Sequence, residues 1–344
     1  MVDERFREIV SNYAQLSVAV VGDYCLDRYL EIDPSIAEVS IETGLEVHNV
    51  TNVRAQPGGC GTILNNLVAL GCGNLLPVGF AGCDGEGYEL INALSVSKTI
   101  DLKYFFQTTE RRTFTYCKPL ILSDGVLPRE LNRLDSKNWT KTPQSVQDNL
   151  ISAIYSLANE VDAIVLLEQV DCPESGVLCG NVLDAISQVR VDHPDLLILA
   201  DSRRGFDHFP SVGFKMNRSE FQSLIGVSGD LPMDELKIEV ARLADLRRQI
   251  VFVSLSEDGI VGAIPGESAA HVPILPLTGE IDVVGAGDTV MANLIMALAS
   301  NASVSESMRI AMAAASIVVK QLGTTGVATQ NDISAILNDF NSTD

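Results

Sequence analysis

The chain alternates short, continuous apolar runs with longer segments of helical periodicity. Strand-like runs rich in Val, Ile and Leu recur as LSVAVVGDY, NLLPVGFAG, DAIVLLEQV, DLLILADSR and QIVFVSLSEDG. Helical spacing of apolar residues occupies residues 61–71, 85–96, 143–159, 174–191, 233–247, 289–300, 304–321 and 330–340. Buried strands that alternate with helices are typical of a doubly wound, mostly parallel sheet flanked by helices. The pattern therefore predicts an α/β fold.

Two segments break this alternation. Residues 29–56 and 104–135 are rich in Thr, Val, Phe and Tyr and lack a helical period. They predict antiparallel strands in a small β-sheet lid, whereas residues 1–28, 57–103 and 136–344 form the α/β core. Because a small sheet with open edges needs cover, we expect the lid to close over a ligand and to pair with the lid of a second subunit in a homodimer.

Composition narrows the range of partners. The 344 residues carry a formal net charge of −21, which argues against binding to nucleic acid or to an anionic membrane, because both require clustered Lys and Arg. No apolar run approaches the roughly 18 residues of a membrane span, and the charged N-terminal segment does not resemble a secretion signal. We expect a cytoplasmic protein. The seven cysteines include no Cys-x-x-Cys pair, so buried thiols are expected rather than a zinc site.

Polar side chains directly follow three of the predicted strands. Asp23 and Asp27 follow the first strand, Glu168 follows another, and Asp201 and Arg203 follow a third. Since ligands of parallel sheets bind beyond the carboxyl ends of the strands, these residues are candidates for a binding site. Two carboxylates after one strand suit hydrogen bonds to vicinal hydroxyl groups. The alternative is that they only form turns and cap helices.

Two glycine-rich turns open into predicted helices. QPGGCGTILNNLVALG, residues 56–71, would let a ligand approach the backbone closely. DVVGAGDT places Asp288 after three small residues, Gly285, Ala286 and Gly287. Such residues leave backbone N–H groups free at a helix N-terminus, where negative charge is stabilised. The alternatives are an ordinary strand-to-helix turn for the first segment and an N-cap role for Asp288.

Three motifs in order make the chain resemble the PfkB/ribokinase family of carbohydrate kinases over nearly its whole length. They are GG at 58–59, NRSE at 217–220 and DVVGAGDT at 282–289. Within that family, VVGDYCLDRY, QPGG, NRLD and VVKQLGTTGV are most similar to the D-glycero-β-D-manno-heptose-7-phosphate kinases, the kinase half of the ADP-heptose synthesis enzyme. The nucleotidyltransferase half of the fused enzymes is not expected here. The resemblance implies a ribokinase-like fold and transfer of the γ-phosphoryl group of ATP to a sugar hydroxyl, specifically C1 of a heptose 7-phosphate.

The resemblance also implies roles for individual residues. Asp288 would be the general base for the sugar hydroxyl, and the transferring phosphoryl group would be stabilised by the backbone of Gly285, Ala286 and Gly287. Mg²⁺ would be organised by Asn217 and Glu220. The nucleotide phosphates would be contacted by Asn217, Ser254, Ser256, Gly259, Gly287 and Gly323. A monovalent cation, K⁺, would lie near Asp282, Val284, Gly323 and Thr324.

Acceptor contacts are implied in the same way. The sugar would be held by Asp23, Asp27, Gly58, Gly59, Asn66 and Glu168. A phosphate on the acceptor would be bound by arginines of the lid, Arg111, Arg112 or Arg133, whose alternative role is surface solubility. Two positions depart from the family pattern, because Thr62 replaces an asparagine expected to contact the substrate and Met312 stands where relatives often have asparagine near the nucleotide. The open alternatives are a nucleoside or simple hexose kinase and a non-catalytic protein that binds a sugar or a nucleotide.

Overall fold

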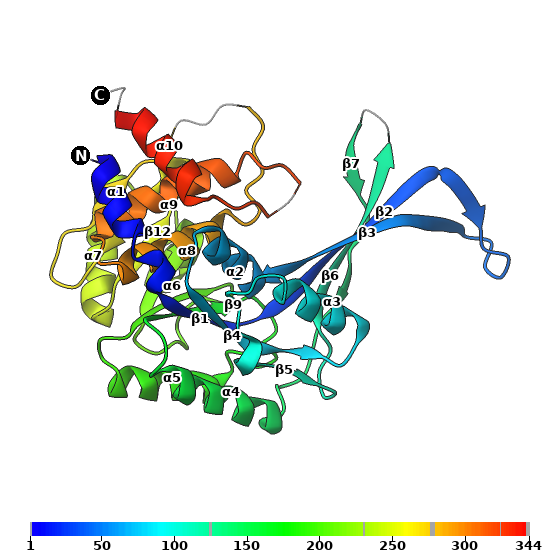
Figure 1. Ribbon diagram of the computed structural model, residues 1–344, viewed down its shortest axis with the longest axis horizontal. Coiled ribbons are helices and arrows are strands. Elements are labelled where there is room, and N and C mark those ends of the chain that lie inside the picture. Colours follow the sequence, from blue (N-terminus) through cyan, green and yellow to red (C-terminus); the bar gives the residue numbers. More distant parts are fainter. Residues whose placement is uncertain (1, 124–125, 230, 276–278, 324, 342–344) are drawn as a thin grey trace.

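A computed structural model describes residues 2–123, 126–229, 231–275, 279–323 and 325–341 (Figure 1). Its main sheet has nine strands in the order β14-β13-β12-β11-β10-β9-β1-β4-β5. The strands are, in that order, Ala270–Val272, Ile260–Ala263, Val251–Ser254, Gly213–Asn217, Leu197–Ser202, Ala163–Glu168, Ser17–Gly22, Asn74–Gly82 and Phe105–Thr108. All neighbours are parallel except the pairs β12–β13 and β13–β14. The predicted α/β class with a mostly parallel sheet is confirmed.

Helices cover both faces of this sheet because side chains alternate along each strand. In β1, Val18 and Val20 pack into one hydrophobic core, whereas Ala19 and Val21 pack into the other. The first core contains residues from α1 (Val2–Val10), α2 (Cys60–Ala69), α3 (Gly85–Leu94), α8 (Ala286–Ala299), α9 (Val304–Val318) and α10 (Gln330–Asn341). The second contains residues from α4 (Gln144–Leu157), α5 (Gly180–Asp192), α6 (Arg218–Ile225) and α7 (Met233–Arg247). Figure 1 shows the two helical layers on opposite sides of the sheet.

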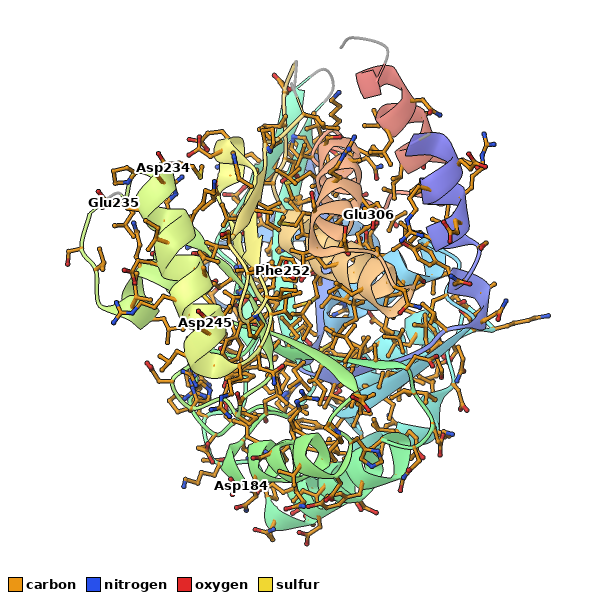
Figure 2. The ribbon with its side chains drawn as sticks, turned by 90° about the vertical axis from the view of Figure 1, so that its left-hand side faces the viewer. Asp184, Asp234, Glu235, Asp245, Phe252 and Glu306 are labelled. Carbon is orange, nitrogen blue, oxygen red and sulfur yellow. The ribbon has the colours of Figure 1, made fainter. Side chains whose placement is uncertain are left out.

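The eight predicted helices are all present; α7 has the predicted bounds, and the others have shifted ends. The helix expected from residue 174 begins only at Gly180, and the helix expected from residue 289 already begins at Ala286. Helices α1 and α6 were not predicted from the apolar spacing. Acidic side chains of α5 and α7, Asp184, Asp234 and Asp245, are exposed, while Phe252 of β12 is buried in the core (Figure 2). Much of the negative charge therefore faces solvent.

A second, small sheet projects from the main body (Figure 1). It contains β2 (Tyr24–Val39), β3 (Glu46–Gly59), β6 (Phe114–Ser123), β7 (Val126–Glu130) and β8 (Leu134–Ser136), in the order β3-β2-β6-β7 with β8 beside β6. Two details correct the sequence prediction. β2 and β6 pair in parallel rather than antiparallel, and residues 105–108 of the expected lid join the main sheet as β5. We call the five strands the small sheet.

The cysteine prediction is confirmed for most of these residues. All seven thiols are free, and five are buried: Cys25, Cys60, Cys72, Cys117 and Cys179. Within the described part of the chain, no group of three or more Cys, His, Asp or Glu side chains is arranged to hold a metal ion. None of the described helices combines the length and apolarity that a bilayer crossing requires.

Candidate active site

A polar cavity of about 140 Å³ lies where the small sheet meets the N-terminus of α8. The position of this cavity follows from the sheet topology. The central strand β1 has β4 as its neighbour on one side and β9 as its neighbour on the other. The strand order reverses at this point, which is where parallel sheets bind ligands. We call it the central cavity. Its lining residues are Asp27, Gly59, Thr62, Tyr116, Lys118, Arg133, Gln169, Arg203, Val284, Gly285, Asp288 and Thr325.

Asp288 enters this cavity from the first turn of α8. Gly285 precedes the helix with φ of 82°, a left-handed conformation that glycine adopts without strain. The helix then starts at Ala286, so Asp288 is its third residue and not its N-cap. Burial raises the pKa of Asp288 to about 7, with Lys215 and Arg203 lowering it and Asp201 raising it. A carboxylate with a pKa near 7 is suited to accept a proton at neutral pH.

Lys215 is a functional candidate that the sequence reasoning missed. It lies on β11, is only 5% exposed, and its Nζ is 2.5 Å from Oδ2 of Asp201. A Cβ atom on Gly287 would lie 3.1 Å from the same Nζ, so the ammonium group sits against the first turn of α8. Burial alone would lower the pKa of Lys215, but Asp201, Asp288 and Glu220 raise it above its ordinary value. The available signal was a lysine inside the apolar strand GFKMN, two residues before the NRSE motif.

Asn217 and Glu220 form a capping box at the start of α6. The Asn217 side chain accepts from the Glu220 backbone N–H at 2.9 Å, and Oε2 of Glu220 accepts from the Asn217 N–H at 2.8 Å. Among the described residues, the hydrogen bond of the Glu220 carboxylate is made by Oε2 and leaves Oε1 without a partner. Burial raises the pKa of this carboxyl group. A free, partly desolvated carboxylate oxygen beside a second cavity fits a hard cation that also binds phosphate oxygens and water.

The acceptor side of the cavity combines one carboxylate with two cations, Lys118 of β6 and Arg133 from the connection between β7 and β8. Nζ of Lys118 is 3.2 Å from Oδ1 of Asp27, and Nη2 of Arg133 is 2.6 Å from Oδ2 of Asp135. The Arg133 guanidinium lies 4.9 Å from the centre of the Tyr116 ring. Lys118 and Tyr116 were not identified from the sequence, because partial alternation does not reveal which face of a strand meets a ligand.

Gly58 and Gly59 make room at this end of β3. A Cβ atom on Gly58 would lie 2.5 Å from Oδ2 of Asp27, and one on Gly59 would lie 2.5 Å from the carbonyl oxygen of Asp23. Gly59 also has φ of 58°. Thr62, the substitute for asparagine, lines the cavity from α2. The backbone turn predicted at this position is therefore close to the cavity.

Three expected sugar contacts face the protein interior instead. The Asp23 carboxylate accepts hydrogen bonds from the backbone N–H groups of Gln169, Val170 and Val177. Asn66 bonds to the Thr62 carbonyl and accepts from Thr289, so it joins α2 to α8. Glu168 is paired with Arg204 and His208. All three side chains are buried and hydrogen-bonded within the protein, and none of them lines the central cavity.

Two of the expected arginines also lie outside the central cavity. Arg111 is 7% exposed and donates to Thr140 and to the carbonyl oxygen of Lys141. The exposed Arg112 side chain is 3.8 Å from Glu86. Both belong to the segment that connects β5 of the main sheet to β6 of the small sheet, and neither lines the central cavity.

The remaining nucleotide and cation candidates lie in loops around α8. Ser254 ends β12 and its hydroxyl donates to the Met216 carbonyl, while Ser256 and Gly259 form the turn to β13. The Asp282 carboxylate accepts from the backbone N–H groups of Val284 and Gly323, which joins the two loops expected to hold K⁺. Thr324 lies outside the described residues. Met312 lines a largely apolar cavity of about 240 Å³ with Val272, Pro273 and Leu275.

Comparisons with known proteins show the family to which the chain belongs. The model of the pfkB family of carbohydrate kinases matches residues 16–331. Curated relatives include the bifunctional protein HldE of Pectobacterium atrosepticum, 31% identical over 324 residues, and that of Helicobacter hepaticus, 27% identical over 322 residues. Each match covers 92% of this chain and 62% of the relative. The chain thus spans less than two thirds of the length of these relatives. The predicted resemblance is confirmed.

Solved structures share the fold. Phosphofructokinase-2 from Escherichia coli, in complex with potassium, aligns with a TM-score of 0.71 and 16% identity over 95% of this chain and 99% of that chain. Arabidopsis thaliana ribokinase, complexed with ribose and ATP, aligns with a TM-score of 0.64 and 19% identity over 94% and 98% of the two chains. The predicted ribokinase-like fold is confirmed.

Proposed function

Because this chain belongs to the PfkB family of carbohydrate kinases and is an ATP-dependent phosphotransferase acting on sugar hydroxyls, we propose that its acceptor is a heptose 7-phosphate, phosphorylated at C1. One observation carries the proposal. The central cavity brings Asp288, with its raised pKa, together with Asp27 and two cations, Lys118 and Arg133. Asp288 can act as a base and Asp27 can accept hydrogen bonds from hydroxyl groups, as a sugar substrate requires. The two cations, in a chain of net charge −21, can bind an anionic group on that sugar.

In the proposed reaction, Asp288 accepts the proton of the C1 hydroxyl as its oxygen attacks the γ-phosphorus of ATP. The N–H groups at the start of α8 and the ammonium of Lys215, which lies against that turn, would stabilise the negative charge that develops on the phosphoryl group. Asn217 and Glu220 would hold Mg²⁺, which would supply positive charge that neutralises the nucleotide phosphates. Asp27 would accept hydrogen bonds from the sugar hydroxyls once Lys118 turns toward the acceptor phosphate.

The decisive experiment measures phosphoryl transfer from Mg·ATP to a panel of heptose phosphates, hexose phosphates, free sugars and nucleosides. We expect a heptose 7-phosphate to have the highest kcat/KM. A higher kcat/KM for a free sugar or a nucleoside would contradict heptose 7-phosphate as the acceptor but would still agree with a kinase reaction. Ligand binding without transfer, detected as a rise in Tm with an unreactive ATP analogue, would indicate a non-catalytic binding protein.

Arg133→Met is expected to weaken binding of a phosphorylated acceptor. A charge-assisted contact contributes about 1.5–3 kcal/mol, so KM should rise by ~10- to 100-fold. The KM of an unphosphorylated sugar should change little. Arg112→Met is the matched control, because it removes the same charge from an exposed position outside the cavity. Equal effects of both variants on both kinds of acceptor would contradict phosphate binding by Arg133.

Glu220→Gln is expected to raise the Mg²⁺ concentration that gives the half-maximal rate. The amide keeps the shape of the side chain but supplies a weaker oxygen ligand to a hard cation. The capping contact to the Asn217 N–H can be retained through the amide oxygen, so Tm in the absence of ligand should stay nearly constant. A Mg²⁺ titration at saturating ATP and acceptor tests this, and an unchanged midpoint would remove Glu220 from the metal site.

The small sheet would also pair with that of a second subunit. The β2–β3 hairpin exposes several apolar side chains, among them Ile36, Val39, Ile41, Leu45, Val50 and Val53. Exposed apolar groups together with open strand edges favour association. We expect sedimentation velocity to show a dimer, and Val39→Asp with Leu45→Asp to shift it toward monomer. A wild-type monomer at assay concentrations would refute this part of the proposal.

A further inference from the structure

Two consecutive arginines after β10 have different environments. Nη1 of Arg204 is 2.6 Å from Oε1 of the buried Glu168, whose carboxylate also accepts from Ser202 and contacts His208. Arg204 therefore neutralises a buried carboxylate and belongs to the protein framework. Arg203 also contacts Glu168, but through its backbone: the Arg203 N–H donates a hydrogen bond to the Glu168 carbonyl oxygen at 3.0 Å.

The Arg203 side chain is exposed, and no carboxylate of the described residues lies within ion-pair distance of it. Arg203 nevertheless lines two cavities. It contributes to the central cavity together with Asp288, and to an adjoining cavity of about 260 Å³ together with Glu220. Its charge lowers the pKa of both of these carboxyl groups.

The other cations near the reaction centre already have anionic partners. Lys118 is paired with Asp27, Arg133 with Asp135 and Lys215 with Asp201. Arg203 differs from them because its guanidinium remains available for an incoming anion. A planar guanidinium can bind two phosphate oxygens at once, which a lysine cannot reproduce.

We propose that Arg203 is a further catalytic residue, which binds the phosphoryl group during its transfer between the nucleotide and the sugar. Arg203 lies between the central cavity, which the base Asp288 lines, and the adjoining cavity, which the candidate metal-binding residue Glu220 lines. The group that must pass between these two carboxylates is the transferring phosphoryl. This inference rests on the proposed kinase reaction but not on the identity of the sugar.

The step balances without another reactant. The acceptor oxygen forms a bond to the γ-phosphorus, and its proton passes to Asp288. The bond from the γ-phosphorus to the β,γ-bridging oxygen breaks, and ADP leaves with that electron pair. Arg203 donates hydrogen bonds to the non-bridging oxygens, remains protonated throughout, and is not consumed.

The test compares Arg203→Met and Arg203→Lys with Arg242→Met. Arg242 is an exposed arginine of α7 that lines neither of the two cavities. We expect Arg203→Met to lower kcat by about 10²-fold, the usual loss when one donor to the developing charge is removed. Arg203→Lys should recover only part of this loss because its ammonium cannot bind two oxygens. Arg242→Met should match the wild type.

A binding measurement separates this proposal from the proposed function. Each protein is titrated with Mg·ADP alone and with Mg·ADP plus aluminium fluoride, a mimic of the transferring phosphoryl group, and Tm is recorded. We expect Arg203→Met to keep the shift caused by ADP and to lose the additional shift caused by aluminium fluoride. Retention of that shift, an unchanged kcat, or a loss confined to the acceptor KM would each overturn the inference. Absence of any additional shift in the wild type would overturn the inference alone, whereas absence of phosphoryl transfer by the wild type would overturn it together with the kinase reaction.

Discussion

Asp288→Asn is expected to abolish most phosphoryl transfer while leaving the fold and nucleotide binding intact. The amide has nearly the shape of the carboxylate but cannot accept the hydroxyl proton, and a positioned general base contributes about 10²- to 10⁴-fold. Kcat for the acceptor should therefore fall by that factor. The shift in Tm produced by Mg·ADP should be unchanged. Activity within a few-fold of the wild type would remove Asp288 from the mechanism.

The same substitution makes a prediction about stability. Burial raises the pKa of Asp288 from 3.8 to about 7, so between these values the folded protein holds a proton that the unfolded chain has lost. The contribution of this group to the free energy of unfolding is greatest below pH 3.8 and decreases as pH rises through 7. Asparagine removes this dependence. Urea titrations should show that Asp288→Asn gains stability relative to the wild type as pH increases from 4 to 8, and a relative loss would contradict the assignment.

Lys215→Met is expected to have the next largest effect, because it removes a buried cation beside α8 and alters the base. Loss of one charge-assisted contact to a phosphate should lower kcat by ~10- to 100-fold. Lys215 also lowers the pKa of Asp288, whereas Asp201 raises it. Since Asp288 must be ionised to act as a base, kcat/KM should rise with pH through a midpoint near 7 in the wild type.

The two neighbours of Asp288 should therefore shift this midpoint in opposite directions. Lys215→Met should move it to higher pH, and Asp201→Asn should move it to lower pH. Because Lys215→Met leaves Asp201 without its partner, the double variant Lys215→Met with Asp201→Asn separates misfolding from loss of catalysis. Shifts in the same direction for both single variants, with Tm unchanged, would contradict the electrostatic description of the site.

Several active-site features were accessible from the sequence because they depend on local backbone chemistry. The small residues before Asp288 indicated a tight turn into a helix, and the structure has Gly285 in a left-handed conformation directly before Ala286. The glycine pair at 58–59 indicated a backbone that a ligand can approach closely. In the structure Gly59 lines the central cavity, and a Cβ atom on either glycine would lie 2.5 Å from a protein oxygen. The expected roles of these residues in catalysis remain predictions.

Sequence reasoning was less successful for side chains after strands, for a physical reason. Asp23 follows β1, Asp27 lies within β2 and Glu168 ends β9, but a carboxylate at any of these positions can accept hydrogen bonds from backbone or ligand equally well. Only the packing of distant loops shows that Asp23 binds the N–H groups of residues 169, 170 and 177, while Asp27 faces the cavity. Lys215 was missed because the groups that surround it, Asp201 of β10 and the first turn of α8, come from other parts of the chain.

The sequence by itself determined the α/β class, the two helical layers and the glycine turns, because hydrophobic periodicity and backbone freedom are properties of neighbouring residues. Tertiary structure decided the parallel pairing of β2 with β6 and the inclusion of β5 in the main sheet. It also decided that Arg204 pairs with the buried Glu168 while the neighbouring Arg203 side chain lines the two cavities. These features depend on which distant groups satisfy a strand edge or a buried charge. The free energy that stabilises these pairings comes from contacts between distant segments, and no pattern along the chain specifies which segments will be partners.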